Sequence, residues 1–217
     1  TKGAPHRVVV IGGGVLALET ADCFLHLGSQ VTLLVRETEF FVRFMDAVVN
    51  QLAIERFVAA GVTVIFDDEV AEFYGDAQGA VRGLRTEKGR ELAADLVRLN
   101  IGAHSELGAV EGSGVAADHS ILVTPRMETN AAGVFAAGDC AAPLNPATGQ
   151  HDYVKLWAPA ADMGRVAGHN ASCDGKIEYR HGTPIGYTYL FDLVYYWIGH
   201  IDPVKSGDGF TVYSRFT

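Results

Sequence analysis

The sequence predicts an α/β fold built on a parallel sheet, and three observations indicate it. A run of β-branched residues, Val8–Ile11, stands directly before a glycine turn and a segment with helical spacing, as in the first strand and helix of a βαβ unit. Further apolar runs, Val31–Val35 and Val62–Phe66, follow helix-like segments. Between residues 70 and 92, short apolar pieces alternate with Gly-Asp and Lys-Gly turn signals. We therefore expect a Rossmann-like parallel sheet with α-helices and a small antiparallel β-meander.

The glycine turn after the first strand carries the strongest functional signal. Gly12 permits a tight turn, Gly14 lets a pyrophosphate approach the backbone, and Ala17 lets the helix pack closely on the strand. The helix expected over residues 15–27 offers free N–H groups to the phosphates. Three glycines in a row also occur in ordinary turns, but the flanking strand and helix favour a dinucleotide site. We expect its contacts to come from Gly12, Gly13, Gly14, Val15 and Leu16.

The end of the second strand is expected to meet the adenosine ribose, about twenty residues beyond the turn. An acidic residue there favours NAD, whereas an arginine favours the 2′-phosphate of NADP. The chain has Arg36 and Glu37 side by side, with Arg43 within reach, so both signs are present. The pattern weakly favours NADPH. The alternative is a solvated arginine and glutamate that open a loop.

The remaining elements of the first half follow from spacing and turn residues. A helix capped by Asp46 and running to about Ala60 presents one apolar face, made of Val49, Leu52, Ala53, Phe57 and Val58. The expected meander strands are Val70–Tyr74, Ala80–Arg85 and Arg90–Leu92. The buried run Asp95–Ile101 then returns to the parallel sheet and ends at Gly102.

The second half contains a separate glycine motif. A short strand from Ile121 is followed by a turn and by Val134–Ala137, which we expect to be a strand ending at Gly138 and Asp139. A glycine there admits a ligand to the backbone, and a carboxylate at a strand end can accept hydrogen bonds from hydroxyl groups. A helix is expected within 152–171, beginning near residues 158–160 because of a proline. Two strands are expected last, Tyr187–Ile198 and Phe210–Phe216.

Charge and cysteine spacing argue against several classes of function. The formal net charge is −9 and no basic run exists, which argues against a nucleic-acid partner. Cys23, Cys140 and Cys173 form no C-x-x-C pair, so neither a disulfide framework nor a metal site is expected, and Cys23 is expected to be buried. The apolar stretch 189–201 is short and contains Asp192, so no membrane anchor is expected. We expect a cytoplasmic protein.

The two glycine motifs, with a meander between them, resemble those of the FAD-dependent pyridine nucleotide-disulfide oxidoreductase superfamily. The resemblance covers residues 6 to about 172. Val8–Ala21 resembles the second, NAD(P)H-binding glycine motif of that family. Thr129–Asp139 resembles its late FAD motif, T-x-x-x-x-V-F-A-A-G-D, and this match is quite specific.

The resemblance implies roles for residues in both motifs. Glu19 matches a family glutamate near the nicotinamide and flavin, and Asp139, beside Gly138, would contact the flavin ribitol. The helix after Trp157 would point its positive end at the flavin ring. Arg36 and Arg43 resemble the paired arginines that NADPH-using members place on the 2′-phosphate, with the second offset by one residue.

The resemblance also implies a division of the chain. Residues 1–120 would form the NAD(P)H-binding domain, residues 121–175 the C-terminal part of an FAD-binding domain, and residues 176–217 the start of a C-terminal interface domain. Family members hold the FAD pyrophosphate with another glycine motif about a hundred or more residues upstream, and this chain has no counterpart to it before Val8. The N-terminal FAD half is therefore expected to be absent.

Two functional hypotheses follow. In the first, the chain is the NAD(P)H-binding portion of a flavin-dependent oxidoreductase that passes hydride from NAD(P)H to FAD and on to a redox protein or small molecule. Alone it would be inactive and would hold FAD poorly, and the complete enzyme could be a homodimer. In the second, the chain is a non-catalytic dinucleotide-binding module, or a subunit that completes a flavin site with a partner chain. The sequence identifies no catalytic residue and no acceptor.

Overall fold

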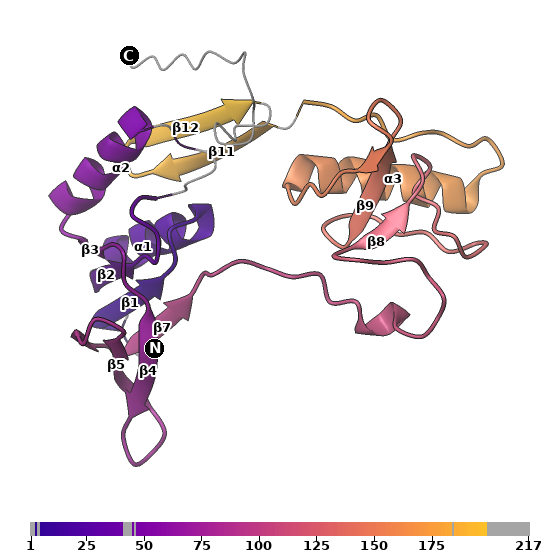
Figure 1. Ribbon diagram of the computed structural model, residues 1–217. Coiled ribbons are helices and arrows are strands. Elements are labelled where there is room, and N and C mark those ends of the chain that lie inside the picture. Colours follow the sequence, from indigo (N-terminus) through magenta and orange to yellow (C-terminus); the bar gives the residue numbers. More distant parts are fainter. Residues whose placement is uncertain (1–2, 4, 41–44, 46, 184, 199–217) are drawn as a thin grey trace. The chain divides into compact units, whose positions relative to one another are not determined.

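The computed structural model describes residues 3, 5–40, 45, 47–183 and 185–198, which form two compact units (Figure 1). The first unit contains the described residues up to Gly102 together with Tyr187–Trp197, and the second contains Ala103–Gly186 and Ile198. The predicted three-domain division, with boundaries at residues 120 and 175, stays a prediction. The expected strand Phe210–Phe216, the cap Asp46 and Arg43 lie outside the described residues.

The first unit is built on a four-stranded parallel sheet in the order β3-β2-β1-β7. Its strands are β1 (Arg7–Ile11), β2 (Gln30–Leu34), β3 (Thr63–Ile65) and β7 (Leu96–Leu99), and its helices are α1 (Val15–His26) and α2 (Ala47–Ala59). Each strand pairs in parallel with its neighbour, so the carboxyl ends of β1, β2 and β7 lie at one edge. The predicted Rossmann-like class is confirmed.

The central strand β1 is buried on both faces by alternate side chains. Val8 and Val10 belong to the core under α1 and α2, whereas Val9 belongs to a second core that includes Leu84 of the meander. Side chains in a strand alternate between faces, so an unbroken valine run is what a doubly covered strand requires. At the start of this strand, hydrogen bonds from Arg7 lower the pKa of Asp95 to about 2 and join β1 to the segment before β7.

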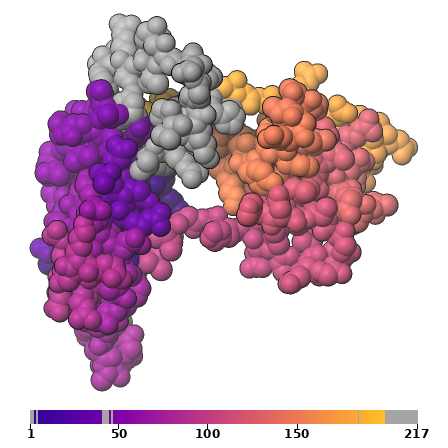
Figure 2. All heavy atoms as spheres, in the orientation of Figure 1, coloured from indigo at the N-terminus to yellow at the C-terminus, as the bar shows by residue number. Residues whose placement is uncertain are grey.

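The predicted meander is confirmed as a separate antiparallel sheet, β4-β5-β6. Its strands are β4 (Val70–Gly75), β5 (Val81–Thr86) and β6 (Glu91–Ala93), each within about two residues of the expected bounds. The turn between β4 and β5 extends as a projection from the first unit (Figures 1 and 2). Asp76 stabilises this turn because its carboxylate accepts hydrogen bonds from the backbone N–H groups of Gln78 and Ala80.

The expected single strand Tyr187–Ile198 is wrong: the chain forms a hairpin of β11 (Ile185–Leu190) and β12 (Leu193–Ile198). Phe191 adopts a positive φ of 57° in the turn, a conformation that a bulky residue rarely adopts and that no glycine signals. Packing accounts for it, since the Phe191 ring lies 4.8 Å from that of Phe57 on α2. An ion pair between Arg56 and Asp192 lies beside this contact.

The second unit combines a three-stranded sheet with one long helix. The strands β8 (Ile121–Val123), β9 (Ala141–Asn145) and β10 (Gln150–His151) lie in the order β10-β9-β8, and the helix is α3 (Trp157–Ser172). A 3-10 turn, η1 (Gly108–Val110), precedes them. Met127, Met163 and Val166 are central to the core between the sheet and α3.

The expected strand Val134–Ala137 is wrong. Only Phe135 makes a bridge, to Glu128, and the strand that pairs with β8 is β9, which begins after a turn at Gly138. The sequence signal for β9 was weak because Pro143 stands within it, and proline is confined to strand edges and irregular positions.

Two side chains expected to be buried are exposed, and so is Leu16, which was expected at the dinucleotide site. Leu16 at the start of α1 is 58% exposed and Val58 near the end of α2 is 56% exposed. Cys23 on α1 is also exposed, so its expected place in the core is wrong. In both helices other residues belong to the core, among them Ala21 on α1 and Ala53 on α2. No helix in the described part of the chain is long and apolar enough to span a membrane.

We predict that Phe57→Ala lowers the free energy of unfolding of the first unit by about 3–5 kcal/mol, because Phe57 is fully buried between Phe40 and Phe191. The substitution Val58→Ala, at the exposed neighbouring position, should change the free energy of unfolding by less than about 0.5 kcal/mol. Urea denaturation followed by fluorescence of the buried Trp197, in a Trp157→Phe background, measures both. Equal losses in the two variants would contradict the packing described.

Candidate functional site

The turn between β1 and α1 brings three neighbouring strands together at the carboxyl edge of the sheet. The N–H of Gly12 donates to the carbonyl of Leu34 at the end of β2, over 2.9 Å. The N–H of Asn100, just after β7, donates to the carbonyl of Ile11 over 2.8 Å. The turn is therefore fixed to both neighbours of β1.

Two of the three glycines are required by this close approach. Gly12 has a φ of +127°, and a Cβ built on it would overlap the carbonyl oxygen of Asn100. A Cβ on Gly13 would lie 2.6 Å from Cγ1 of Val35. Any side chain at either position would push the turn away from β7 or β2.

Gly14 differs because nothing lies beside it. No described atom comes within 4 Å of a Cβ built on Gly14, which is the N-cap of α1. Within the described residues, the N–H groups of Gly14, Val15 and Leu16 donate to no other group. The first turn of a helix carries partial positive charge, so the position offers space and unpaired donors to an anion. Ala17, fully buried, lets α1 pack closely here.

Arg36 and Glu37 follow β2 and form an ion pair. Nη2 of Arg36 lies 2.9 Å from Oε1 of Glu37, and the Arg36 side chain is 68% exposed. The hydrogen bond to Glu37 raises the pKa of Arg36, so the guanidinium keeps its charge. Both residues stand at the carboxyl edge of the sheet that contains the glycine turn, and their side chains are paired with each other.

Glu19 lies in α1 with its carboxylate held by the C-terminal hairpin. Oγ1 of Thr188 on β11 donates to Oε1 of Glu19 over 2.8 Å, and Thr188 is fully buried. This contact could not be predicted from the sequence, because 169 residues separate the partners. It fixes the direction of the Glu19 side chain.

The end of β7 holds a residue that sequence reasoning missed. Both side-chain polar atoms of Asn100 are buried and have no hydrogen-bond partner in the described structure. Its neighbours Leu99 and Ile101 are 49% and 73% exposed, although both are large and apolar. Gly102, predicted as a site residue, follows with a φ of +107° and ends the first unit. The sequence carried no signal that distinguishes Asn100 from a solvated asparagine after a strand.

The second predicted site lies in the other unit. Gly138 has a φ of +84°, and Asp139 after it is exposed, with its carbonyl accepting from Ser105 rather than its carboxylate. Trp157 is the first residue of α3 and is 87% exposed, and no side chain caps this helix. The unit thus presents a carboxylate, an aromatic ring and a free helix N-terminus.

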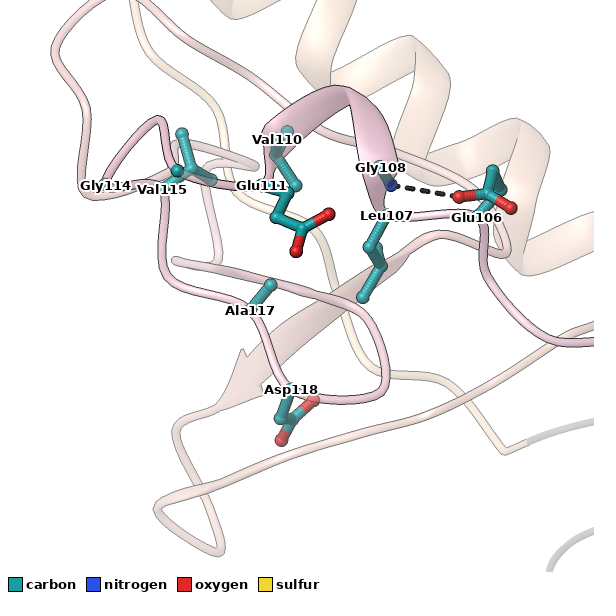
Figure 3. Close-up of a pocket in the computed structure, with 10 residues that line it drawn as sticks. Glu106, Leu107, Gly108, Val110, Glu111, Gly114, Val115, Ala117 and Asp118 are labelled. Carbon is teal, nitrogen blue, oxygen red and sulfur yellow. Dashed lines mark hydrogen bonds between the residues drawn. The ribbon is translucent and has the colours of Figure 1, made fainter.

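A hollow of about 520 Å³ in the second unit does not match either predicted site (Figure 3). Its lining comes from residues 106–118 and includes the carboxylates of Glu106, Glu111 and Asp118, with Glu106 accepting from the N–H of Gly108 over 3.0 Å. Three acidic groups without a basic residue in the lining disfavour a phosphate ligand. No cluster of metal-ligating side chains occurs among the described residues.

The chain resembles known proteins over most of its length. Residues 1–164 match the family model described as pyridine nucleotide-disulphide oxidoreductase. An NADH oxidase from Enterococcus faecalis is 28% identical over 186 residues, which are 85% of this chain and 41% of that protein.

Two solved structures are similar in fold and sequence. An FAD-dependent pyridine nucleotide-disulphide oxidoreductase from Desulfovibrio vulgaris has a TM-score of 0.83 and 27% identity, over 91% of this chain and 50% of the other. The second is a water-forming NADPH oxidase engineered from a Lactobacillus brevis NADH oxidase and bound to NADPH. It has a TM-score of 0.76 and 26% identity, over 87% of this chain and 41% of the other. The chain spans half or less of the length of these proteins.

We predict that alanine at the first glycine of the turn is strongly destabilising, whereas alanine at the third has little effect on stability. Gly12→Ala should lower the free energy of unfolding by more than about 2 kcal/mol, because it combines a positive φ with overlap on the Asn100 carbonyl. Gly14→Ala should change it by less than about 0.5 kcal/mol, because the space beside Gly14 is open. Urea denaturation measures both, and a strongly destabilised Gly14→Ala would show that the position is closed.

Proposed function

The chain belongs to the pyridine nucleotide-disulphide oxidoreductase family, and we propose that it binds NAD(P)H at the β1–α1 turn, as part of an enzyme that passes hydride from NAD(P)H to FAD and on to an acceptor. The observation that carries the proposal is the glycine turn, in which two glycines are fixed by contacts with neighbouring strands while Gly14 is open and followed by unpaired N–H groups. NAD(P)H would supply the hydride, and FAD would accept it.

The pyrophosphate would be held by the backbone. Gly14, Val15 and Leu16 supply N–H donors at the positive end of α1, and the missing side chain at Gly14 lets the phosphates approach them. Because these donors are backbone N–H groups of a fixed turn, binding does not have to order any side chain to place them.

The adenosine half would extend over the end of β2, where Arg36 selects the 2′-phosphate of NADPH. The pair with Glu37 does not prevent this role, because an exposed ion pair contributes little and a phosphate is a stronger, bidentate partner for arginine. The engineered NADPH oxidase supports the assignment, since its five substitutions remove an aspartate, add two arginines and replace a glycine by alanine. This chain has Arg36 and Ala17, with Val35 before the arginine.

The flavin contacts proposed for the second unit come from the segment around Asp139 and from α3. Asp139 would accept hydrogen bonds from the flavin ribitol, and Trp157 and the N-terminus of α3 would face the flavin ring. Glu19, directed by Thr188, would flank the path of the hydride. A tryptophan that is 87% exposed at the start of α3 is unusual for so large an apolar side chain, and a ligand ring that covers it would account for it.

We predict that the purified chain binds NADH without retaining FAD. Isothermal titration should give a saturable NADH signal, and the absorbance of the purified protein near the flavin bands should be absent. Gly14→Ala should weaken NADH binding about tenfold while leaving the fold intact, because the methyl group occupies the phosphate approach. As a control, Gly79→Ala changes a meander turn and should not affect NADH affinity. FAD retained at one per chain, or NADH binding insensitive to Gly14→Ala, would overturn this assignment.

Cofactor preference has its own test. NADPH should bind more tightly than NADH, and Arg36→Ala should lower NADPH affinity about tenfold with little change for NADH. Arg85→Ala is the matched control, because Arg85 is also exposed and paired with a carboxylate, that of Glu72, but lies in the meander. If the ratio of the two affinities is unchanged in Arg36→Ala, the preference is not set by this residue.

A further inference from the structure

Asn100 is a half-buried residue beside the glycine turn, and in the described structure the two buried polar atoms of its side chain make no hydrogen bond. Its backbone N–H donates to the carbonyl of Ile11, and its carbonyl oxygen lies where a side chain on Gly12 would have to stand. Its side-chain oxygen and nitrogen are both sealed from solvent and unpartnered in the described structure. A side-chain amide offers two donors and an acceptor with two lone pairs, and leaving such groups buried without partners is costly.

The two asparagines that are buried as whole residues in the described part of the chain have hydrogen-bonded side chains. Asn50, 2% exposed, accepts from the N–H of Phe40 over 3.2 Å and donates to the carbonyl of the same residue over 2.6 Å. Asn170, 1% exposed, donates to the carbonyls of Arg126 and Ile177 and accepts from the N–H of Ile177. Asn100 is therefore an exception to the way this fold treats buried amides, and such an exception calls for a physical reason.

The sheet order assigns Asn100 to one half of the dinucleotide. The strands run β2-β1-β7, and a dinucleotide whose pyrophosphate lies on the turn after β1 extends in opposite directions across its two neighbours. The adenosine half lies over β2, where Arg36 stands, so the nicotinamide half lies over β7. Leu99 and Ile101 on either side of Asn100 are exposed and apolar, which suits the face of the nicotinamide ring.

We propose that Asn100 binds the nicotinamide half of NAD(P)H, by turning its side-chain amide to the donors and acceptors that this half presents. The inference rests on the proposed function and adds a residue to the same site. The carboxamide of nicotinamide offers an NH₂ and a carbonyl oxygen, which are complementary to the carbonyl oxygen and NH₂ of an asparagine. The ribose hydroxyls offer the same two kinds of group. Binding then provides the partners that Asn100 lacks in the free protein.

The test compares Asn100→Leu with Asn50→Leu in the full chain, using NADH and ADP as probes. NADH has the nicotinamide half and ADP does not. Asn100→Leu should lower NADH affinity about tenfold and leave ADP affinity within about twofold, and its melting temperature should equal or exceed that of the unmodified chain, because leucine removes an unsatisfied amide at similar volume. Asn50→Leu should lower the melting temperature, because its two hydrogen bonds are lost, with the NADH-to-ADP affinity ratio unchanged.

The outcomes separate this inference from the proposed function. If the unmodified chain binds neither NADH nor ADP, the proposed function fails. If it binds both and Asn100→Leu changes neither affinity, only the role of Asn100 is overturned. A loss of stability in Asn100→Leu equal to that in Asn50→Leu would also overturn it, because the amide would then have a structural partner.

A second measurement needs no variant. The side-chain NH₂ resonances of Asn100 in ¹⁵N-labelled protein should shift on addition of NADH and stay in place on addition of ADP. Resonances unchanged by NADH, while NADH binding is saturated, would rule out the contact even if Asn100→Leu does not fold.

Discussion

The contact between Gly12 and the carbonyl of Asn100 is the constraint on which the rest of the first unit depends. It brings the turn after β1 against the end of β7, while the bond from Gly12 to Leu34 holds the same turn to β2. These contacts set where α1 begins and which way its N-terminus points. An added methyl group at Gly12 would separate strands that the core requires to be adjacent, so one glycine links the packing of the sheet to the geometry of the site.

The two faces of the parallel sheet are covered by different kinds of element. Helices α1 and α2 bury Val8 and Val10 on one side, and the meander buries Val9 on the other. A crossover from β3 to β7 is long enough to hold a helix, yet the turn signals between residues 70 and 92 favour three short strands. The carboxyl edge of the sheet is left uncovered by either layer, because both pack on the faces of the sheet.

Features fixed by local sequence could be predicted, and features fixed by distant contacts could not. The turn at Gly12 and the meander follow from adjacent residues, so their positions were predicted closely. The hairpin turn at Phe191 depends on the ring of Phe57, which is far away in the chain, and aromatic residues alone indicate a continuous strand. Asn100 could be recognised only once its surroundings were known, since an asparagine near a strand end is usually solvated.

Hydrophobic patterning does not predict burial for several large apolar residues at the carboxyl edge of the sheet. Leu16 follows the helical spacing of apolar residues, yet it is 58% exposed in the first turn of α1, beside the open space at Gly14. Leu99 and Ile101 are exposed at the end of β7. With a formal net charge of −9, the chain places backbone N–H groups, neutral amides and apolar side chains at this edge, with Arg36 at its far end. Under the proposed function, attraction for the pyrophosphate would come from the helix terminus and the fixed turn, and the apolar residues around it would face the rest of the dinucleotide.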